Sequence, residues 1–182
     1  MHAVYLFMCV IFMQFVFFLV DTCEPGRNQT AFLETAHDSQ LSGSSFLHYR
    51  YAYNRSRLHT QTESGEAKDA WIARLNEIGE YIQAAFTDVR RVEAVATQGR
   101  ADANQWVTSY KFAYSMDGVT FEYVRDVDGS ERVFSGNSDR DTVVRHSLFS
   151  VVLARFVRLY PQDYNDHMTL RWEVYGCVHI GT

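Results

Sequence analysis

The stretch Val107-Thr-Ser-Tyr-Lys-Phe-Ala-Tyr-Ser115, followed at once by Met116-Asp117-Gly118, decides the fold class of this chain. Aromatic residues at positions 110, 112 and 114 alternate with Lys, Ala and Ser at positions 111, 113 and 115, which is the period of a half-buried β-strand. The Asp-Gly pair supplies a turn, and residues 121–124 offer an apolar partner strand. The pattern predicts an antiparallel hairpin.

Outside this hairpin the chain continues as short β-like runs. They are rich in β-branched and aromatic residues and lie at 81–86, 89–97, 143–149, 154–160 and 169–175. Residues 71–80 alone are compatible with a helical turn, and we find neither an internal repeat nor a linker. Many short strands at near-regular spacing indicate an all-β antiparallel sandwich or barrel that forms one domain.

The N-terminal segment indicates the compartment. Residues 3–20 carry no charge, and only Gln14 interrupts their apolar run before Asp21. This composition is typical of a secretory signal peptide, although His2 replaces the usual Lys or Arg, and an uncleaved signal anchor is the alternative. Both readings place the remainder outside the cytosol. We therefore expect a leader at 1–22, a domain at 23–177 and a tail at 178–182.

The cysteines and the glycosylation motifs fit this extracellular setting. Cys9 lies in the leader, which leaves Cys23 and Cys177 at the two ends of the domain. In an oxidising compartment such a pair is expected to form a disulfide that joins the termini. Asn28 and Asn54 each begin an Asn-x-Ser/Thr triplet and are candidate glycosylation sites.

Charge and motifs argue against several classes of function. The net charge is −5, whereas a general nucleic-acid binder is basic, so nucleic acid is not an expected partner. The acidic residues near 126–131 and at 139 and 141 fit turns better than a metal site, which needs more oxygen ligands. The histidines are dispersed, and the sequence contains no catalytic motif. We expect no enzyme, no metal and no cofactor.

Several strings match a known family in its own order. They are Asp38–Ser45, Tyr81–Gln83, Ala96–Arg100, Ser109–Gly118, Phe134–Asp139, Ala154–Pro161 and Leu170–Cys177. Together they resemble the discoidin domain, also known as the coagulation factor V/VIII C-type domain, over almost all of residues 23–177. Two departures are Ala84-Ala85-Phe86, where the family usually has a hydrophobic residue, Asp and Leu, and the stretch 50–71, which fits the family pattern poorly.

The resemblance implies a jelly-roll-like barrel of about eight antiparallel strands, closed by Cys23 and Cys177. It also implies loops that project from one end and bind phospholipid, glycan, collagen or a receptor, depending on the family member.

The first projecting loop corresponds to residues 46–59, which contain three tyrosines, three arginines and no acid. Leu47, Tyr49, Arg50 and Tyr51 are its candidate ligand-binding residues. Apolar and aromatic side chains can enter a membrane interface beside arginines that meet anionic headgroups, or the same rings can stack on a sugar. The alternative is that the aromatic residues pack inward and the arginines are simply solvated.

A second loop at 98–106 supplies Arg100, Asn104 and Trp106 as further candidates for contact with a polar ligand, and an ordinary polar loop is the alternative. We expect a secreted adhesion or attachment module whose partner is a cell-surface glycan, a glycoprotein or a matrix protein. Docking to anionic phospholipid is the second hypothesis, and a purely structural matrix protein is the third. A single module has limited contact area, so oligomers would supply avidity, although no sequence feature shows how they would form.

Overall fold

The computed structural model describes residues 29–61 and 69–178. The predicted leader, Cys23, the Asn28 triplet and residues 179–182 lie outside these ranges. Within the described ranges, no helix is both long enough and apolar enough to cross a membrane.

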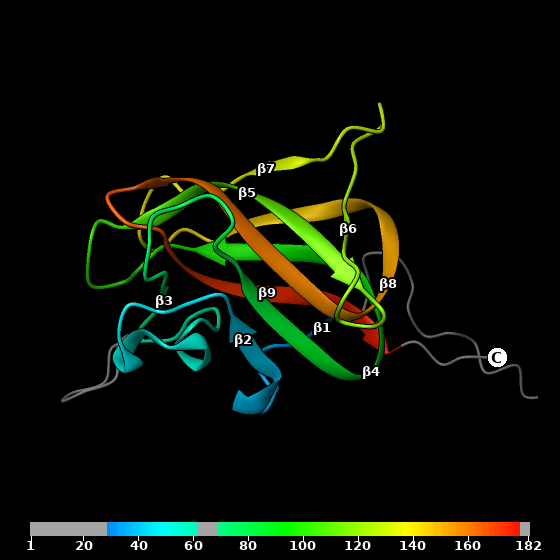
Figure 1. The fold of residues 1–182 in the computed structure, drawn as a ribbon, viewed down its shortest axis with the longest axis horizontal. Helices are drawn as coiled ribbons and strands as arrows, with labels where there is room; N and C mark the ends of the chain where they lie inside the picture. The colour runs from blue at the N-terminus through cyan, green and yellow to red at the C-terminus, as the bar shows by residue number, and fades with distance from the viewer. Residues whose placement is uncertain (1–28, 62–68, 179–182) are drawn as a thin grey trace, which may run out of the picture.

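The described chain is built almost entirely from antiparallel strands, as the alternation at 107–115 predicts (Figure 1). The sheet runs in the order β1-β9-β4-β8-β5-β6, while β2 pairs with β4, β3 with β9 and β7 with β5. The strands are β1 (Thr30–Ala31), β2 (Leu41–Gly43), β3 (Trp71–Ile72), β4 (Ile82–Gln98), β5 (Trp106–Ser115), β6 (Glu122–Tyr123), β7 (Val133–Ser135), β8 (Val144–Asn165) and β9 (Thr169–Val178). Three 3-10 turns accompany them: η1 (Asp38–Gln40), η2 (Tyr49–Tyr51) and η3 (Tyr53–Arg55).

Two long strands replace four predicted short ones. The runs predicted at 81–86 and 89–97 are one strand, β4, and those at 143–149 and 154–160 are both part of β8. The chain does not break where two strands were predicted, but its pairing is irregular there: the β4–β8 register shifts between Ala85 and Arg90. The predicted helical turn at 71–80 was wrong, since this segment begins with β3, which pairs with β9.

The hairpin around Asp117 and Gly118 folds as predicted. Tyr110 and Phe112 are buried, and β6 pairs with β5 through Ala113 and Tyr114. Gly118 adopts a φ of +75°, which favours glycine. The Asp117 carboxylate accepts the backbone N–H groups of Val119 and Thr120, and these bonds lower the pKa of Asp117 to about 2.

The core lies between the two layers of the bent sheet and combines aliphatic with aromatic side chains. Trp71 and Trp172 are fully buried, and the rings of Tyr110 and Phe134 stack with centroids 5.3 Å apart. Each indole N–H of the two tryptophans reaches a loop: Trp71 donates to the Ser45 carbonyl and Trp172 to the Ser56 hydroxyl. The core therefore holds the loop at 44–59 in place.

Near its end β9 carries the predicted disulfide cysteine. Cys177 is disulfide-bonded. Its predicted partner, Cys23, lies outside the described residues, so the Cys23–Cys177 pairing stays a prediction.

Candidate functional site

Loops from four parts of the chain meet at one end of the barrel. They are residues 44–59, 73–80, 99–105 and 166–168, which lie toward the left of Figure 1. Hydrogen bonds join neighbouring loops: the Ser45 hydroxyl reaches the Glu80 carboxylate, and the Asn165 amide donates to the Asn104 carbonyl at 2.7 Å. We call this region the loop end.

The first loop exposes only part of its predicted binding residues. Leu47 and Tyr49 are 47% and 58% exposed, whereas Arg50 and Tyr51 are half-buried. Two short 3-10 turns, η2 and η3, hold this shape, and the His48 ring caps η2 by accepting the Arg50 N–H. The Arg50 guanidinium lies 5.8 Å from the centre of the Tyr49 ring.

One arginine of this loop contributes to the fold. Arg57 pairs with Asp38 at 2.7 Å and also donates to the carbonyls of Leu33, Ala36 and Asn54. These bonds fasten the loop to the segment before β2, and the partnership lowers the pKa of Asp38. Arg57 is therefore engaged within the fold, which weakens the expectation that the arginines of this loop meet anionic headgroups.

Arg100 joins the two predicted loops. Its guanidinium lies 4.9 Å from the centre of the Tyr51 ring, and its Nη2 donates to the Tyr51 hydroxyl at 3.2 Å. The same side chain forms an ion pair with Asp102 and donates to the Gln105 amide oxygen at 2.8 Å. Burial favours a lower pKa for Arg100, but the hydrogen bond and charge of Asp102 raise it overall. We call Tyr51, Arg100, Asp102 and Gln105 the Arg100 cluster.

The other two candidates of the second loop flank this cluster. Asn104 is exposed, and its carbonyl is held by Asn165. Trp106 is half-buried at the start of β5. The loop packs closely on it, because a Cβ added to Gly99 would lie 2.9 Å from the Trp106 Cβ. The structure thus brings Tyr51, Arg100, Asn104 and Trp106 into one region.

Two residues that support the loop end, and a histidine beside them, were not found from the sequence. Arg171, fully buried in β9, donates to the carbonyls of Gly99, Thr60 and Arg140. Asp69, also fully buried, accepts the backbone N–H groups of Ala101 and Asp102. His167 has a lowered pKa, caused first by burial. No local pattern signals the roles of Arg171 and Asp69, because each of their partners lies far away in the chain.

Exposed apolar side chains lie on two of the loops at the loop end. Leu75 and Ile78 are exposed in the loop that follows β3. Leu47 lies in the adjacent loop, and its N–H donates to the carbonyl of Ile72 in β3 at 2.9 Å. We call Leu47, Leu75 and Ile78 the apolar rim.

The acidic turns do not gather into a metal site in the described part of the chain, where no group of three or more His, Cys, Asp or Glu side chains is suited to a metal ion. Asp128 accepts the backbone N–H of Ser130, and Asp139 accepts those of Asp141 and Thr142. The hydroxyl groups of Ser130 and Thr142 also donate to these carboxylates, and these hydroxyl bonds, followed by the backbone bonds, lower the pKa of both carboxyl groups.

A barrel whose recognition loops gather at one end defines a class of β-sandwich modules. The chain belongs to the F5/8 type C domain family, whose model matches residues 40–174. This confirms the family and the fold class that the sequence strings suggested.

Known proteins with similar sequence or structure support the same assignment. A discoidin-1 chain of Dictyostelium discoideum is 35% identical over 148 residues, which cover 75% of this chain and 56% of that protein. The solved structure of discoidin II from the same organism matches with a TM-score of 0.73 at 26% identity, covering 84% of this chain and 60% of that one. A family 32 carbohydrate-binding module of Clostridium perfringens NanJ, solved in complex with galactose, shares the fold with a TM-score of 0.54 at 15% identity, covering 81% and 98% of the two chains. The chain thus spans little more than half the length of its discoidin relatives.

Proposed function

We propose that this protein is an extracellular recognition module without catalytic activity, and that its Arg100 cluster binds a carbohydrate of a cell-surface or matrix glycoprotein. The observation that carries the proposal is the contact between Arg100 and Tyr51, which fixes a guanidinium and an aromatic ring from two loops in one place. The disulfide at Cys177 supports an oxidising compartment.

The chemistry of the cluster suits a polar ligand with many hydroxyl groups. Aromatic rings present an apolar face to the C–H side of a sugar, while guanidinium and amide groups form directional hydrogen bonds with its hydroxyls. Here Tyr49 offers an exposed ring, and Asn104 offers an exposed amide next to the cluster. Because hydrogen bonds already hold Arg100 in position, little side-chain entropy is lost when a ligand binds.

A second candidate function is docking to an anionic phospholipid surface, and the apolar rim is the observation that favours it. Leu47, Leu75 and Ile78 are exposed on adjacent loops and have the character of side chains that enter a membrane interface. Cationic support for such docking is weaker, because Arg57 and Arg100 are paired with Asp38 and Asp102. We therefore place carbohydrate binding first.

A pair of variants separates the two functions. The secreted protein is applied to a glycan array and, in parallel, to liposomes with and without phosphatidylserine. Arg100→Ala should abolish glycan binding, and Arg100→Lys should restore little of it, because lysine lacks the fork of donors. A Leu47→Ser and Ile78→Ser double variant should leave glycan binding intact.

Arg155, which lies on β8 and donates to the Thr87 carbonyl, supplies the matched control Arg155→Ala. The proposal fails if the protein binds liposomes alone and the rim variant removes that binding. It also fails if a bound glycan is retained by a folded Arg100→Ala protein.

A further inference from the structure

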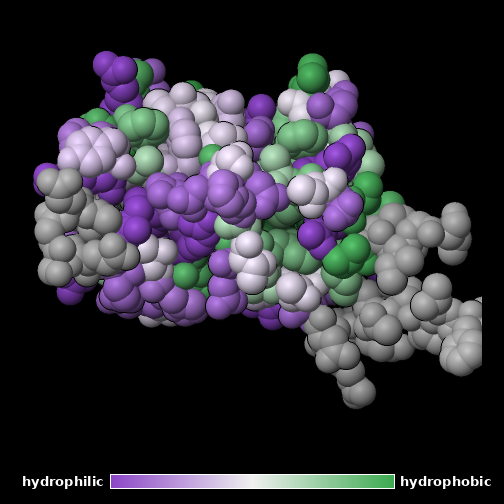
Figure 2. Space-filling model, turned by 90° about the horizontal axis from the view of Figure 1, so that it is seen from below, coloured by the Kyte–Doolittle hydropathy of each residue, from purple (hydrophilic) through white to green (hydrophobic). Residues whose placement is uncertain are grey.

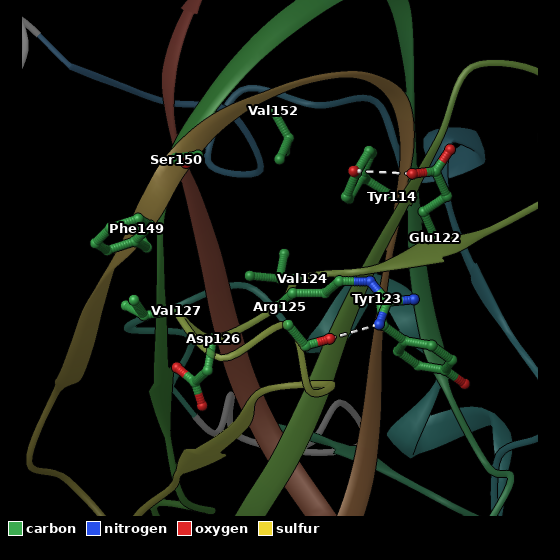
Figure 3. Close-up of a pocket in the computed structure, with 11 residues that line it drawn as sticks. Tyr114, Glu122, Tyr123, Val124, Arg125, Asp126, Val127, Phe149, Ser150 and Val152 are labelled. Atoms are coloured by element: carbon green, nitrogen blue, oxygen red, sulfur yellow. Dashed lines mark hydrogen bonds between the residues drawn. The ribbon is translucent and has the colours of Figure 1, made fainter.

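A second distinctive surface lies away from the loop end, between β8 and the segment that connects β6 to β7. This connecting segment projects from the barrel in Figure 1. A groove of about 400 Å³ separates it from β8, with Val124, Val127, Phe149 and Val152 among its lining residues (Figure 3).

Large apolar side chains are exposed on both sides of this groove. Phe149 is 69% exposed and Val127 is 79% exposed. Val151 and Leu153, farther along the same stretch of β8, are also exposed. Figure 2, which views the molecule from below, shows hydrophobic side chains mainly in its right-hand half. We call Val127, Phe149, Val151 and Leu153 the β8 face.

The β8 backbone is irregular at these exposed residues. Ser147 pairs with Ala94 and Val152 pairs with Val92, so residues 148–151 of β8 lie opposite the single β4 residue Glu93. Pairing between β8 and β5 begins only at Phe156. Among the described residues, no strand therefore pairs with the other edge of β8 at 144–155. An unpaired strand edge with apolar side chains is a template for another chain.

Both signs of charge lie around the groove. Arg125 and Asp126 line it, and Glu122 lies at its other side. Two copies related by a two-fold axis present the same patch to each other, so charges of both signs on one patch can pair with those of the other copy. Here Arg125 of one copy can face an acidic residue of the other, whereas an anionic membrane would meet Glu122 and Asp126 unfavourably.

We propose that the β8 face is an interface between two copies of this chain, which pair antiparallel along the free edge of β8. Phe149 of each copy would fill the groove of the other. The loop ends of such a dimer would remain free, and two ligand sites in one particle give avidity. This inference is independent of which ligand the loop end binds.

The test is the molar mass of the secreted protein, measured by light scattering after size exclusion and by sedimentation velocity over a range of concentrations. The wild-type protein should show a concentration-dependent dimer. Phe149→Asp and Val151→Asp should each weaken dimerisation about tenfold or more, as expected for a buried anchor at an interface. Ile78→Asp is the matched control, because Ile78 is 68% exposed but belongs to the apolar rim.

A positive measurement complements these losses. Ser150→Cys places a thiol near the proposed two-fold axis and should give a disulfide-linked dimer under mild oxidation. An unchanged melting temperature and circular dichroism spectrum of Phe149→Asp separates lost pairing from misfolding. A wild-type protein that is monomeric at every concentration would overturn the proposal. So would a dimer that survives Phe149→Asp and Val151→Asp but dissociates in Ile78→Asp, since its interface would lie at the loop end.

Discussion

At the loop end, Arg100 contacts Tyr51, Asp102 and Gln105, and the buried Arg171 holds three carbonyl groups beneath them. At the β8 face, Phe149 and Val127 expose an apolar ring and methyl groups, and the strand edge has no strand partner among the described residues. The first region is a network of directional bonds. The second is apolar area beside an unpaired edge.

The contrast separates two modes of recognition. A network that is already bonded holds its groups in fixed positions, so it discriminates between ligands by geometry. Apolar area gains free energy from burial in proportion to its size, at about 25 cal/mol per Å², and is far less selective. The contrast fits the two proposals, in which the loop end chooses the ligand and the β8 face mediates self-association.

The largest expected effect is a loss of stability when the support beneath the loop end is removed. Arg171→Met would leave the carbonyls of Gly99, Thr60 and Arg140 without their donor in a buried site. We expect a loss of about 3 kcal/mol or more of unfolding free energy, since each buried unsatisfied group costs about 1–3 kcal/mol. Urea denaturation measures it. Arg155→Met, on the surface, should change stability by no more than about 0.5 kcal/mol, and an equally small effect at Arg171 would contradict the assignment.

The next prediction concerns the disulfide at Cys177, at the end of β9 that lies away from the loop end. Cys177→Ser should lower the unfolding free energy by about 2–5 kcal/mol, the usual range for a small secreted domain. Because Thr169 and Leu170 of β9 pair with β3 near the loops, whereas Cys177 pairs with Arg91, the ligand affinity of folded molecules should change little. Non-reducing peptide mapping checks the predicted partner, Cys23. A free Cys177 thiol in the native protein would refute the bridge.

Much of the fold could be predicted because its signals are local. The alternation at 107–115 and the Asp117-Gly118 turn depend on neighbouring residues, and the hairpin forms as expected. Strand continuity could not be predicted in the same way. The breaks expected within β4 and β8 are register shifts, and a shift depends on the partner strand rather than on local composition.

In the candidate site, too, the features with local sequence signals could be predicted and the contacts between distant segments could not. The composition of residues 46–59 suggested a binding loop, and Leu47 and Tyr49 are indeed exposed there. The same composition did not show that Arg57 would be taken by Asp38, or that Arg100 would meet Tyr51 across a separation of 49 residues. Contacts between distant segments follow from the assembled barrel, so the supporting roles of Asp69 and Arg171 could not be predicted either.

An intermediate effect is expected from the aromatic residues of the first loop. Replacing Tyr49 and Tyr51 together by Ala should weaken ligand binding by about 2 kcal/mol or more, as for aromatic anchors at other interfaces. The melting temperature should change little, because Tyr49 is exposed and Tyr51 is only half-buried. Tyr51→Phe removes only the hydroxyl that Arg100 contacts, so it should weaken binding less. A double variant that unfolds while its folded fraction binds normally would mark both tyrosines as structural.

The smallest effect concerns the protonation of His167. Burial is the main cause of its lowered pKa. The charge of Asp166 acts in the opposite direction, and the charge of Arg100 lowers the pKa further. Within the described chain its Nδ1 is buried without a hydrogen-bond partner. The folded protein therefore takes up this proton less readily than the unfolded chain, whose histidine pKa is about 6.5.

Because the unfolded state binds more protons in this range, stability should fall as the pH drops below about 6.5 toward the folded pKa. NMR titration of the ring measures the pKa directly. Arg100→Ala should raise the pKa of His167, and Asp166→Asn should lower it further. These opposite shifts would show that the loops at 99–105 and 166–168 share one electrostatic environment. An unchanged His167 pKa in Arg100→Ala would instead show that the charge of Arg100 does not reach the loop at 166–168. The two loops would then be electrostatically independent.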